Sequence, residues 1–176
     1  FVSSTSMLVR RDLAQGLGGL DAKLPPVAAG LDFSQRARLA GGSVIAVPSS
    51  EVYHQGRCEG SGSLWREEAG RLRAMVIAYS PLTLVWLLPY DLLVSILDSL
   101  ASLLLLRWRP ALTHLMSLGW NLFRLPSTLG RRRRFKPVRA LGDEELFRFQ
   151  ARGSVRLRAV GAELANRILS LFDGDQ

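Results

Sequence analysis

The pattern of hydrophobic and polar positions changes once along the chain, at about residue 73. Before that point, short apolar stretches alternate with Gly, Ser, Pro and charged residues, as is typical of a soluble α/β unit. Between residues 74 and 106 the only formal charges are Asp91 and Asp98, and after this run arginine dominates the charged positions. The pattern therefore predicts an α/β segment followed by an all-α, membrane-associated helical region.

Two stretches of the first part have the composition of short buried strands, residues 5–9 and residues 44–47. In the first stretch, Met7 and Val9 fall on the same face of an extended chain. The two stretches predict an α/β segment whose sheet is incomplete. Because the chain opens on Phe1 within the strand-like pattern and carries no initiating Met, we expect it to be a fragment of a longer protein.

Two helices are expected between these strands. Asp12 and Gln15 have the spacing of a capping box. Gly18–Gly19 should end that short helix, because glycine adopts positive φ without strain. Pro25–Pro26 indicates an extended loop, and the second helix is expected over residues 31–40.

Several motifs of this part occur in a fixed order: MLVRR at 7–11, GGLD at 18–21, Asp32 with Arg36, Gly41, Pro48 and His54. Their order and spacing resemble the second half of the catalytic domain of inverting family 2 glycosyltransferases, which have the GT-A fold. The resemblance covers about fifty residues. It implies that residues 1–57 are a partial GT-A domain with a Rossmann-like segment. It also implies a nucleotide-diphosphate sugar as donor and a divalent metal, Mg²⁺ or Mn²⁺, held mainly by residues upstream of Phe1.

The resemblance also implies roles for individual residues. The family's acidic pair, whose second member is usually the general base, falls on Ala29-Gly30, so the base position is occupied by Gly30. Inverting transfer needs a carboxylate that takes the proton of the acceptor hydroxyl. Asp32 is the nearest carboxylate and the candidate base, although two residues along a helix turn it by about 200°. Asp21 and Arg36 are expected on the acceptor side.

Each of these residues also has a simpler interpretation. Asp32 has the place of a carboxylate at a helix N-terminus, and its i,i+4 pair with Arg36 would then be a surface ion pair worth about 0.3–0.5 kcal/mol. Asp21 suits a turn after two glycines. His54 resembles the histidine that helps hold the donor's metal, and the alternative is an ordinary loop histidine.

Residues 58–73 are expected to form a flexible joint and a charged helix, and residues 74–130 a membrane-associated helical hairpin or span. As one helix, the apolar run would be about 50 Å long, against about 30 Å of hydrocarbon. Pro81 and Pro89 should break its first half. Asp91 and Asp98 are costly in a bilayer unless they face protein or water.

Two segments of this region could enter a bilayer, residues 90–106 and the amphipathic residues 111–129, which Pro126 should end. If both cross, Arg131–Arg134 returns to the side of the catalytic part, in agreement with the positive-inside rule. If neither crosses fully, they form an interfacial hairpin and every arginine stays cytosolic, which is the arrangement we expect. A buried helix pair in a soluble protein is the remaining alternative.

Residues 131–176 are expected to be a basic cytosolic tail with amphipathic helices, the first near residues 143–150 and the second over 155–172. The net charge of +8 is concentrated in the C-terminal half. Such charge suits anionic membrane lipids. A nucleic-acid partner is disfavoured, because the apolar run needs lipid and aromatic residues do not alternate with the basic ones.

Together these observations predict an inverting glycosyltransferase, of hexosyltransferase type, at the cell membrane with its catalytic part in the cytoplasm. It would move a sugar from a nucleotide-diphosphate donor to a lipid-linked or cell-envelope glycan. Without the upstream half, this chain alone is expected to be inactive. The loss of the acidic pair leaves a second hypothesis, a catalytically degenerate scaffold in an envelope-synthesis complex.

Overall fold

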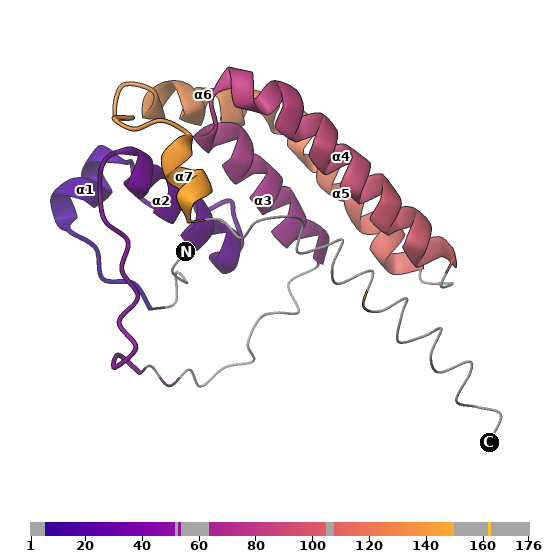
Figure 1. Cartoon of the computed structure of the whole chain (residues 1–176), viewed down its shortest axis with the longest axis horizontal. Helices are drawn as coiled ribbons and strands as arrows, with labels where there is room; N and C mark the ends of the chain where they lie inside the picture. Colours follow the sequence, from indigo (N-terminus) through magenta and orange to yellow (C-terminus); the bar gives the residue numbers. More distant parts are fainter. Residues whose placement is uncertain (1–5, 52, 54–63, 105–107, 150–161, 163–176) are drawn as a thin grey trace.

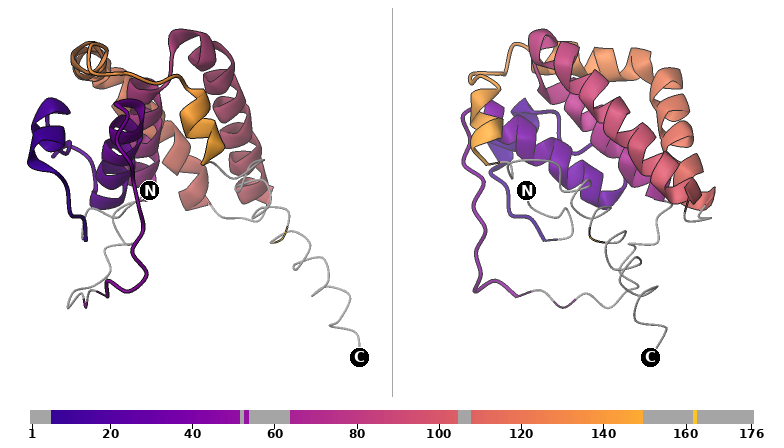
Figure 2. Two further views of the ribbon diagram at one scale, coloured as in Figure 1. Left: turned by 60° about the vertical axis from the view of Figure 1, so that its left-hand side comes forward. Right: turned by 45° about the vertical axis from the view of Figure 1, so that its right-hand side comes forward.

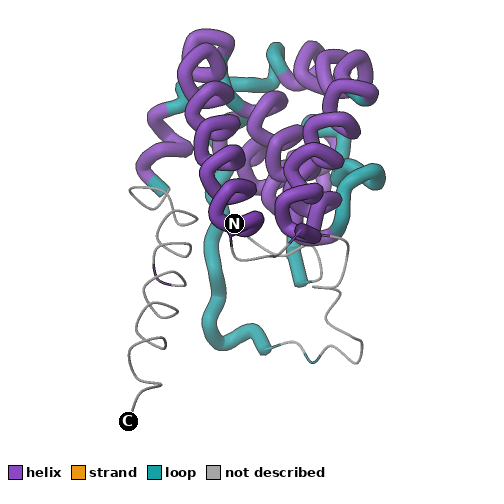
Figure 3. The backbone as a smooth tube through the Cα atoms, turned by 90° about the vertical axis from the view of Figure 1, so that its right-hand side faces the viewer, coloured by secondary structure: helices purple, strands orange, loops and turns teal. Residues whose placement is uncertain are grey.

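A computed structural model describes residues 6–51, 53, 64–104, 108–149 and 162. All regular structure in these residues is helical (Figure 3). The helices are α1 (Arg11–Gly16), α2 (Pro26–Leu39), α3 (Leu64–Ala78), α4 (Pro81–Leu104), α5 (Trp108–Phe123), α6 (Leu125–Phe135) and α7 (Glu144–Arg148).

The longer helices form successive layers in the order α2, α3, α5 and α4. Helix α3 packs against α2 and α5, and α4 packs against α5. Helices α4 and α5 lie side by side as a long hairpin in Figures 1 and 2, so that α4 is the outermost layer. Helix α6 follows directly after α5 and packs back onto α3.

One hydrophobic core joins all four segments that the sequence distinguishes. Its buried members include Leu17 and Phe33 from the first segment, Leu72 from the second, Ile77 from the third and Phe135 from the fourth. The segment that resembles a glycosyltransferase and the apolar hairpin region are therefore packed into the same core.

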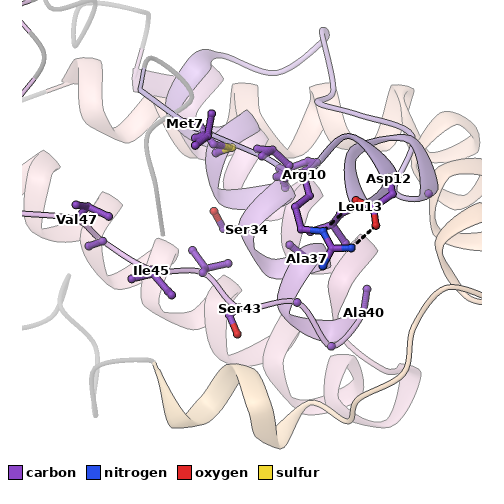
Figure 4. Close-up of a pocket in the computed structure, with 18 of the residues that line it drawn as sticks. Met7, Arg10, Asp12, Leu13, Ser34, Ala37, Ala40, Ser43, Ile45 and Val47 are labelled. Carbon is purple, nitrogen blue, oxygen red and sulfur yellow. Dashed lines mark hydrogen bonds and ion pairs between the residues drawn. The ribbon is translucent and has the colours of Figure 1, made fainter. Parts of the chain in front are cut away.

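The predicted α/β segment is wrong, because the described residues contain no strand. Residues 7–9 and 44–47 have no regular structure, and no backbone ladder joins them to another segment among the described residues. Figure 4 places Met7 on one of these segments and Ile45 and Val47 on the other, along an open groove beside α2. A strand is stable only when a neighbour satisfies its backbone, and β-prone side chains alone do not supply one.

The prolines start helices more often than they end them. Pro26 lies in the first turn of α2, where its missing N–H costs nothing, so the helix begins five residues earlier than expected. Pro81 likewise begins α4, and Pro126 lies in the first turn of α6, so residues 111–129 belong to two helices. Pro89 lies inside α4 without ending it, and the predicted break is wrong there.

The short helix α1 ends as expected but begins differently. Gly18 and Gly19 have φ of 69° and 66°, which confirms the predicted glycine stop. The capping box is wrong, because Arg10 is the N-cap residue and makes no side-chain cap. Asp12 instead accepts a hydrogen bond of 2.5 Å from the guanidinium of Arg10, drawn as a dashed line in Figure 4.

Asp143 links the start of the hairpin to the C-terminal part of the described chain through hydrogen bonds. Its carboxylate accepts hydrogen bonds from the backbone N–H of Ser80 at 3.0 Å and from the hydroxyl of Thr83 at 2.6 Å. Ser80 immediately precedes α4 and Thr83 lies in its first turn, so Asp143 binds the N-terminal end of this helix. Burial opposes ionisation of Asp143, but the bonds from Ser80, Thr83 and Arg139 outweigh it and lower the pKa of this carboxyl.

Helices α2 and α3 are packed close together at Gly70. A Cβ built on Gly70 would overlap the Cβ of Ala28 on α2, and it would contact Leu24 and Pro25 at 3.5 Å. The absence of a side chain at residue 70 thus sets the distance between the two helices.

We expect Gly70→Ala to lower the free energy of unfolding by about 1–3 kcal/mol, because the added methyl forces two helices apart. Gly119→Ala on α5 is the matched control. A Cβ built there has no side chain of another described residue within 4 Å. Alanine is the better helix former by about 0.8–1.0 kcal/mol, so the control should be neutral or stabilising. Urea denaturation followed by circular dichroism in detergent measures both. Equal stability of the two variants would contradict the close approach.

Candidate functional site

The loop after α1 directs backbone carbonyl groups at a buried arginine. Because Gly18 and Gly19 adopt positive φ, the chain reverses between α1 and α2. The carbonyl oxygens of Leu17 and Gly19 then accept hydrogen bonds from the Arg36 guanidinium at 2.7 and 2.9 Å. Arg36 therefore holds this loop against α2.

Asp32 and Arg36 lie one turn apart on α2 and form a buried ion pair. The guanidinium donates two hydrogen bonds, of 2.6 and 3.0 Å, to Oδ2 of Asp32. The exposed fractions of the two side chains are 0% for Asp32 and 1% for Arg36. The interpretation as a weak surface ion pair is therefore wrong, and the energetics are those of a charge pair removed from water.

Asp21 forms a second buried pair with an arginine of α3. Arg73 donates a hydrogen bond of 3.0 Å to Oδ2 of Asp21, while Oδ1 accepts one of 3.1 Å from the backbone N–H of Lys23. Arg73 also donates to the hydroxyl of Thr128 at 2.5 Å. These bonds link the 17–21 loop, α3 and α6.

Arg131 on α6 joins the two pairs. Its guanidinium lies 3.8 Å from Oδ2 of Asp21 and 3.7 Å from Oδ2 of Asp32. It also donates a hydrogen bond of 2.9 Å to the carbonyl of Gly19. We call Asp21, Asp32, Arg36, Arg73 and Arg131 the charge cluster. With two carboxylates and three guanidinium groups, the cluster carries a formal charge of +1.

Within the charge cluster, the pKa values of Asp21 and Arg131 are both lowered. Burial opposes ionisation of Asp21, but the Lys23 amide and the guanidinium of Arg73, helped by Arg131, outweigh it and lower the pKa of the carboxyl. Burial and the neighbouring charge of Arg36 lower the pKa of Arg131, and the carboxylates of Asp32 and Asp21 oppose this shift. Both groups are nevertheless charged at neutral pH.

The two carboxylates of the charge cluster differ in their remaining hydrogen-bonding capacity. Both oxygens of Asp21 accept hydrogen bonds. Arg36 binds Oδ2 of Asp32, whereas Oδ1 is buried and has no partner among the described residues. One oxygen of Asp32 thus orients the carboxylate and the other is left to accept a proton or a hydrogen bond.

Three of the four site residues predicted from the sequence lie together. Asp21, Asp32 and Arg36 meet in the charge cluster, and their catalytic or binding roles stay predictions. His54 lies outside the described residues. Gly30, at the expected base position, is buried on α2. The described part of the chain contains no group of three His, Cys, Asp or Glu residues that could hold a metal ion.

Sequence reasoning missed the contributions of Arg73 and Arg131. The run of four arginines was expected to suit anionic lipids, but its members face two ways. Arg131 enters the charge cluster and Arg132 donates to the carbonyl of Val76. Arg133 and Arg134 are exposed. The helical periodicity of α6 could have indicated that Arg131 faces the protein, because residues 128, 131 and 135 share one face.

The second notable feature is a polar stripe on α4 that faces the protein. The stripe comprises Asp91, Ser95, Asp98 and Ser102, at helical spacings of 4, 3 and 4 residues. Asp91 pairs with Arg71 of α3 at 2.5 Å, and Asp98 lies 3.1 Å from Nε2 of the α5 histidine at position 114. The two aspartates that are costly in lipid therefore face protein.

The opposite side of α4 is apolar and exposed. Its exposed side chains include Leu93, Ile96, Leu97, Leu100 and Leu103. At 24 residues the helix is about 36 Å long, against about 30 Å of hydrocarbon. Among the helices in the described residues, α4 is the one with the length and apolar composition needed to cross a membrane.

Comparison of the chain with protein-family models, with curated proteins and with solved structures finds no match.

We expect Arg36→Met to lower the free energy of unfolding by about 3–5 kcal/mol, because it leaves Asp32 and two loop carbonyl groups without their buried donor. Arg10→Met is the matched control, since the Arg10–Asp12 pair is exposed at both ends, and it should leave stability nearly unchanged.

The double variant Asp32→Leu/Arg36→Met tests whether the cost is electrostatic. Removing both charges should restore part of the stability, because no isolated carboxylate remains. Chemical denaturation of the wild-type protein, Asp32→Leu, Arg36→Met and the double variant completes the cycle. A double variant less stable than Arg36→Met would show that the pair matters through packing alone.

Proposed function

We propose that this protein is attached to a membrane through the α4–α5 hairpin and acts there in glycosyl transfer. The observation that carries the attachment is the reversed polarity of α4, whose polar stripe faces the protein while leucine and isoleucine face outward. In water this arrangement would expose a large apolar surface, whereas in lipid it is the stable one.

The exposed cations suggest how the hairpin is oriented. Helix α6 begins where α5 ends, at the open end of the hairpin, and carries exposed Arg133 and Arg134 followed by exposed Lys136. Such residues bind anionic headgroups on the cytoplasmic leaflet. We therefore place the open end of the hairpin and the charge cluster on the cytoplasmic side.

Two observations support glycosyl transfer. The ordered motifs between residues 7 and 54 resemble inverting family 2 glycosyltransferases. The residues that this resemblance assigns to the acceptor side and to proton transfer lie together in the charge cluster, where one oxygen of Asp32 has no partner in the part of the chain that the structure describes. The proposed donor is a nucleotide-diphosphate sugar with Mg²⁺ or Mn²⁺, and the proposed acceptor is a lipid-linked or cell-envelope glycan.

The proposed chemistry needs access to Asp32. The 17–21 loop lies over its partner Arg36, so movement of that loop would open the carboxylate to an acceptor hydroxyl. Oδ1 would take the hydroxyl proton as the oxygen attacks the anomeric carbon. The guanidinium of Arg36 would hold the other oxygen throughout.

A specific observation favours the second candidate, a non-catalytic scaffold in an envelope-synthesis complex. Ala29-Gly30 is buried on α2, and Ala29 packs in a small cluster with Leu24 and Ala28 against Trp120. Small residues here serve helix packing, so the position of the usual acidic pair has become part of the core. The turnover experiment below separates the two candidates.

We expect the double variant Leu93→Lys/Ile96→Lys to lose attachment to phosphatidylcholine/phosphatidylglycerol vesicles, because each lysine in a bilayer costs about 2.5–3.5 kcal/mol. Flotation on a density gradient measures attachment. Leu8→Lys/Ile45→Lys is the matched control, since it adds the same charge at two exposed apolar positions away from the hairpin and should still float.

The wild-type protein should stay attached in about 1 M salt, where headgroup attraction is screened within about 3 Å. Arg133→Gln/Arg134→Gln should float less well on anionic vesicles at low salt and equally well on neutral ones. Release of the wild-type protein by salt alone would contradict insertion of the hairpin.

For the chemistry, we expect Asp32→Asn to lower turnover by about 10²–10⁴-fold, the usual contribution of positioned proton transfer. Transfer of labelled sugar from nucleotide-diphosphate donors to membrane lipid, in membranes that carry the protein, measures turnover. Asp21→Asn is the matched control. It removes one charge from the same cluster, but both oxygens of Asp21 are already bonded, so its turnover should fall much less.

Three outcomes are distinguishable. Transfer that depends on Asp32 supports the enzyme, and chelation of divalent metal should abolish it. Equal losses in Asp21→Asn and Asp32→Asn would show that the charge cluster is structural. No transfer by the wild-type protein with any donor would favour the scaffold.

A further inference from the structure

The outermost helix, α4, has an apolar line that runs along its whole length. Its members follow one another at spacings of 4, 7, 4, 3 and 4 residues, so they fall within about 40° of one direction at about 100° per residue. The polar stripe lies on the opposite side of the same helix. The apolar line is exposed from the first turn to the last, and it consists of Leu82, Trp86, Leu93, Leu97, Leu100 and Leu104.

Helix α7 extends this line sideways with an aromatic side chain. The rings of Trp86 and Phe147 stack with their centroids 6.1 Å apart. Both remain partly exposed, Trp86 at 54% and Phe147 at 39%. The next residue of α7 is Arg148, whose side chain is 77% exposed. An aromatic ring and a cation therefore lie beside the apolar line, which is a combination typical of protein surfaces at a membrane interface.

Helix α3 lies alongside the hairpin over much of its length (Figure 1). Arg71 of α3 binds Asp91 of α4 at 2.5 Å, and Asn121 of α5 donates a hydrogen bond of 3.0 Å to the carbonyl of Ala69. Asp91 is about 15 Å along α4, close to the middle of a helix of about 36 Å. If the hairpin crossed a bilayer, α3 and its exposed Arg66 would enter the hydrocarbon with it, where an arginine is costly.

Arginine occurs at both ends of the hairpin. The sequence places Arg107 and Arg109 between the end of α4 and the first turn of α5, and α6 carries Arg133 and Arg134 after the other end. A hairpin that crossed the bilayer would carry the first pair through the hydrocarbon, against the positive-inside rule. A hairpin that lies along one leaflet leaves all four arginines on the same side of the membrane.

We propose that the apolar line of α4 and Phe147 of α7 form one docking surface for a single phospholipid leaflet, so that α4 lies along the membrane and does not cross it. Leucine side chains and the two aromatic rings enter the upper acyl region, and Arg148 binds anionic headgroups. The polar stripe stays against the protein, so no aspartate enters lipid. This surface rests on the proposed membrane attachment, and it adds both an orientation and helix α7 to it.

Spin labels along α4 distinguish the two orientations. In a Cys58→Ser background, which removes the one cysteine of the chain, Leu82→Cys, Leu93→Cys and Leu104→Cys each carry a nitroxide. These positions face the same way and span about 33 Å of helix. In phosphatidylcholine/phosphatidylglycerol vesicles, the accessibility of each label to oxygen and to a nickel chelate measures its depth. We expect all three labels at one depth, about 5–10 Å into the interface.

A helix across the bilayer gives a different depth profile. The label at residue 93 would then lie about 15 Å deeper than the labels at both ends, since half of the hydrocarbon is about 15 Å thick. A difference of that size between any two of the three labels would overturn the proposal while leaving membrane attachment intact. Three labels in water, on a protein that does not float with vesicles, would contradict the attachment itself and the docking surface with it.

A label on α7 tests whether this helix belongs to the surface. Labelled Phe147→Cys should lie in lipid at the depth of the α4 labels. Ile45→Cys is the matched control, since residue 45 is an exposed apolar position beside α2, and its label should stay in water. If circular dichroism shows that Phe147→Cys does not fold, labelled Arg148→Cys takes its place and should lie at the headgroups. An α7 label as accessible to the nickel chelate as the label at residue 45 would overturn the proposal.

Discussion

The arrangement of the N-terminal helices depends on the burial of two carboxylates beside three guanidinium groups. Removing one member of such a cluster lowers stability, because its partner charges are then less well compensated away from water. Its members come from the 17–21 loop, α2, α3 and α6. These elements are therefore held together by electrostatics as much as by apolar contact. The close approach of α2 and α3 at Gly70 lies three residues from Arg73, which binds Asp21.

Local features of the fold could be predicted from the sequence, and features that need a distant partner could not. The glycine stop after α1, the charged helix α3 and the short helix α7 each follow from residues adjacent in the chain. The two expected strands failed because a strand requires a neighbour that local composition cannot supply. The same limit applies to the charge cluster. The Asp32–Arg36 spacing was visible, but Arg73 lies 52 residues from Asp21 and nothing local pairs them.

The number of apolar residues alone does not predict how the hairpin is oriented. The apolar run was evident from the sequence, and so were its two aspartates and two prolines. What allows α4 to lie in lipid is that both aspartates face the protein. This orientation follows from the helical spacing that they share with Ser95 and Ser102. Because Pro81 starts α4 and Pro89 does not end it, the helix is long enough to cross the hydrocarbon.

Helix α6 connects the two halves of the molecule physically. One face carries Thr128 and Arg131 to the charge cluster, and another carries Arg133 and Arg134 to solvent or headgroups. Both faces belong to one helix of 11 residues. A force that shifts α6 at the membrane surface therefore also shifts Arg131 relative to Asp21 and Asp32. The guanidinium beside the carboxylate proposed for proton transfer and the surface proposed for lipid contact are therefore carried by the same helix.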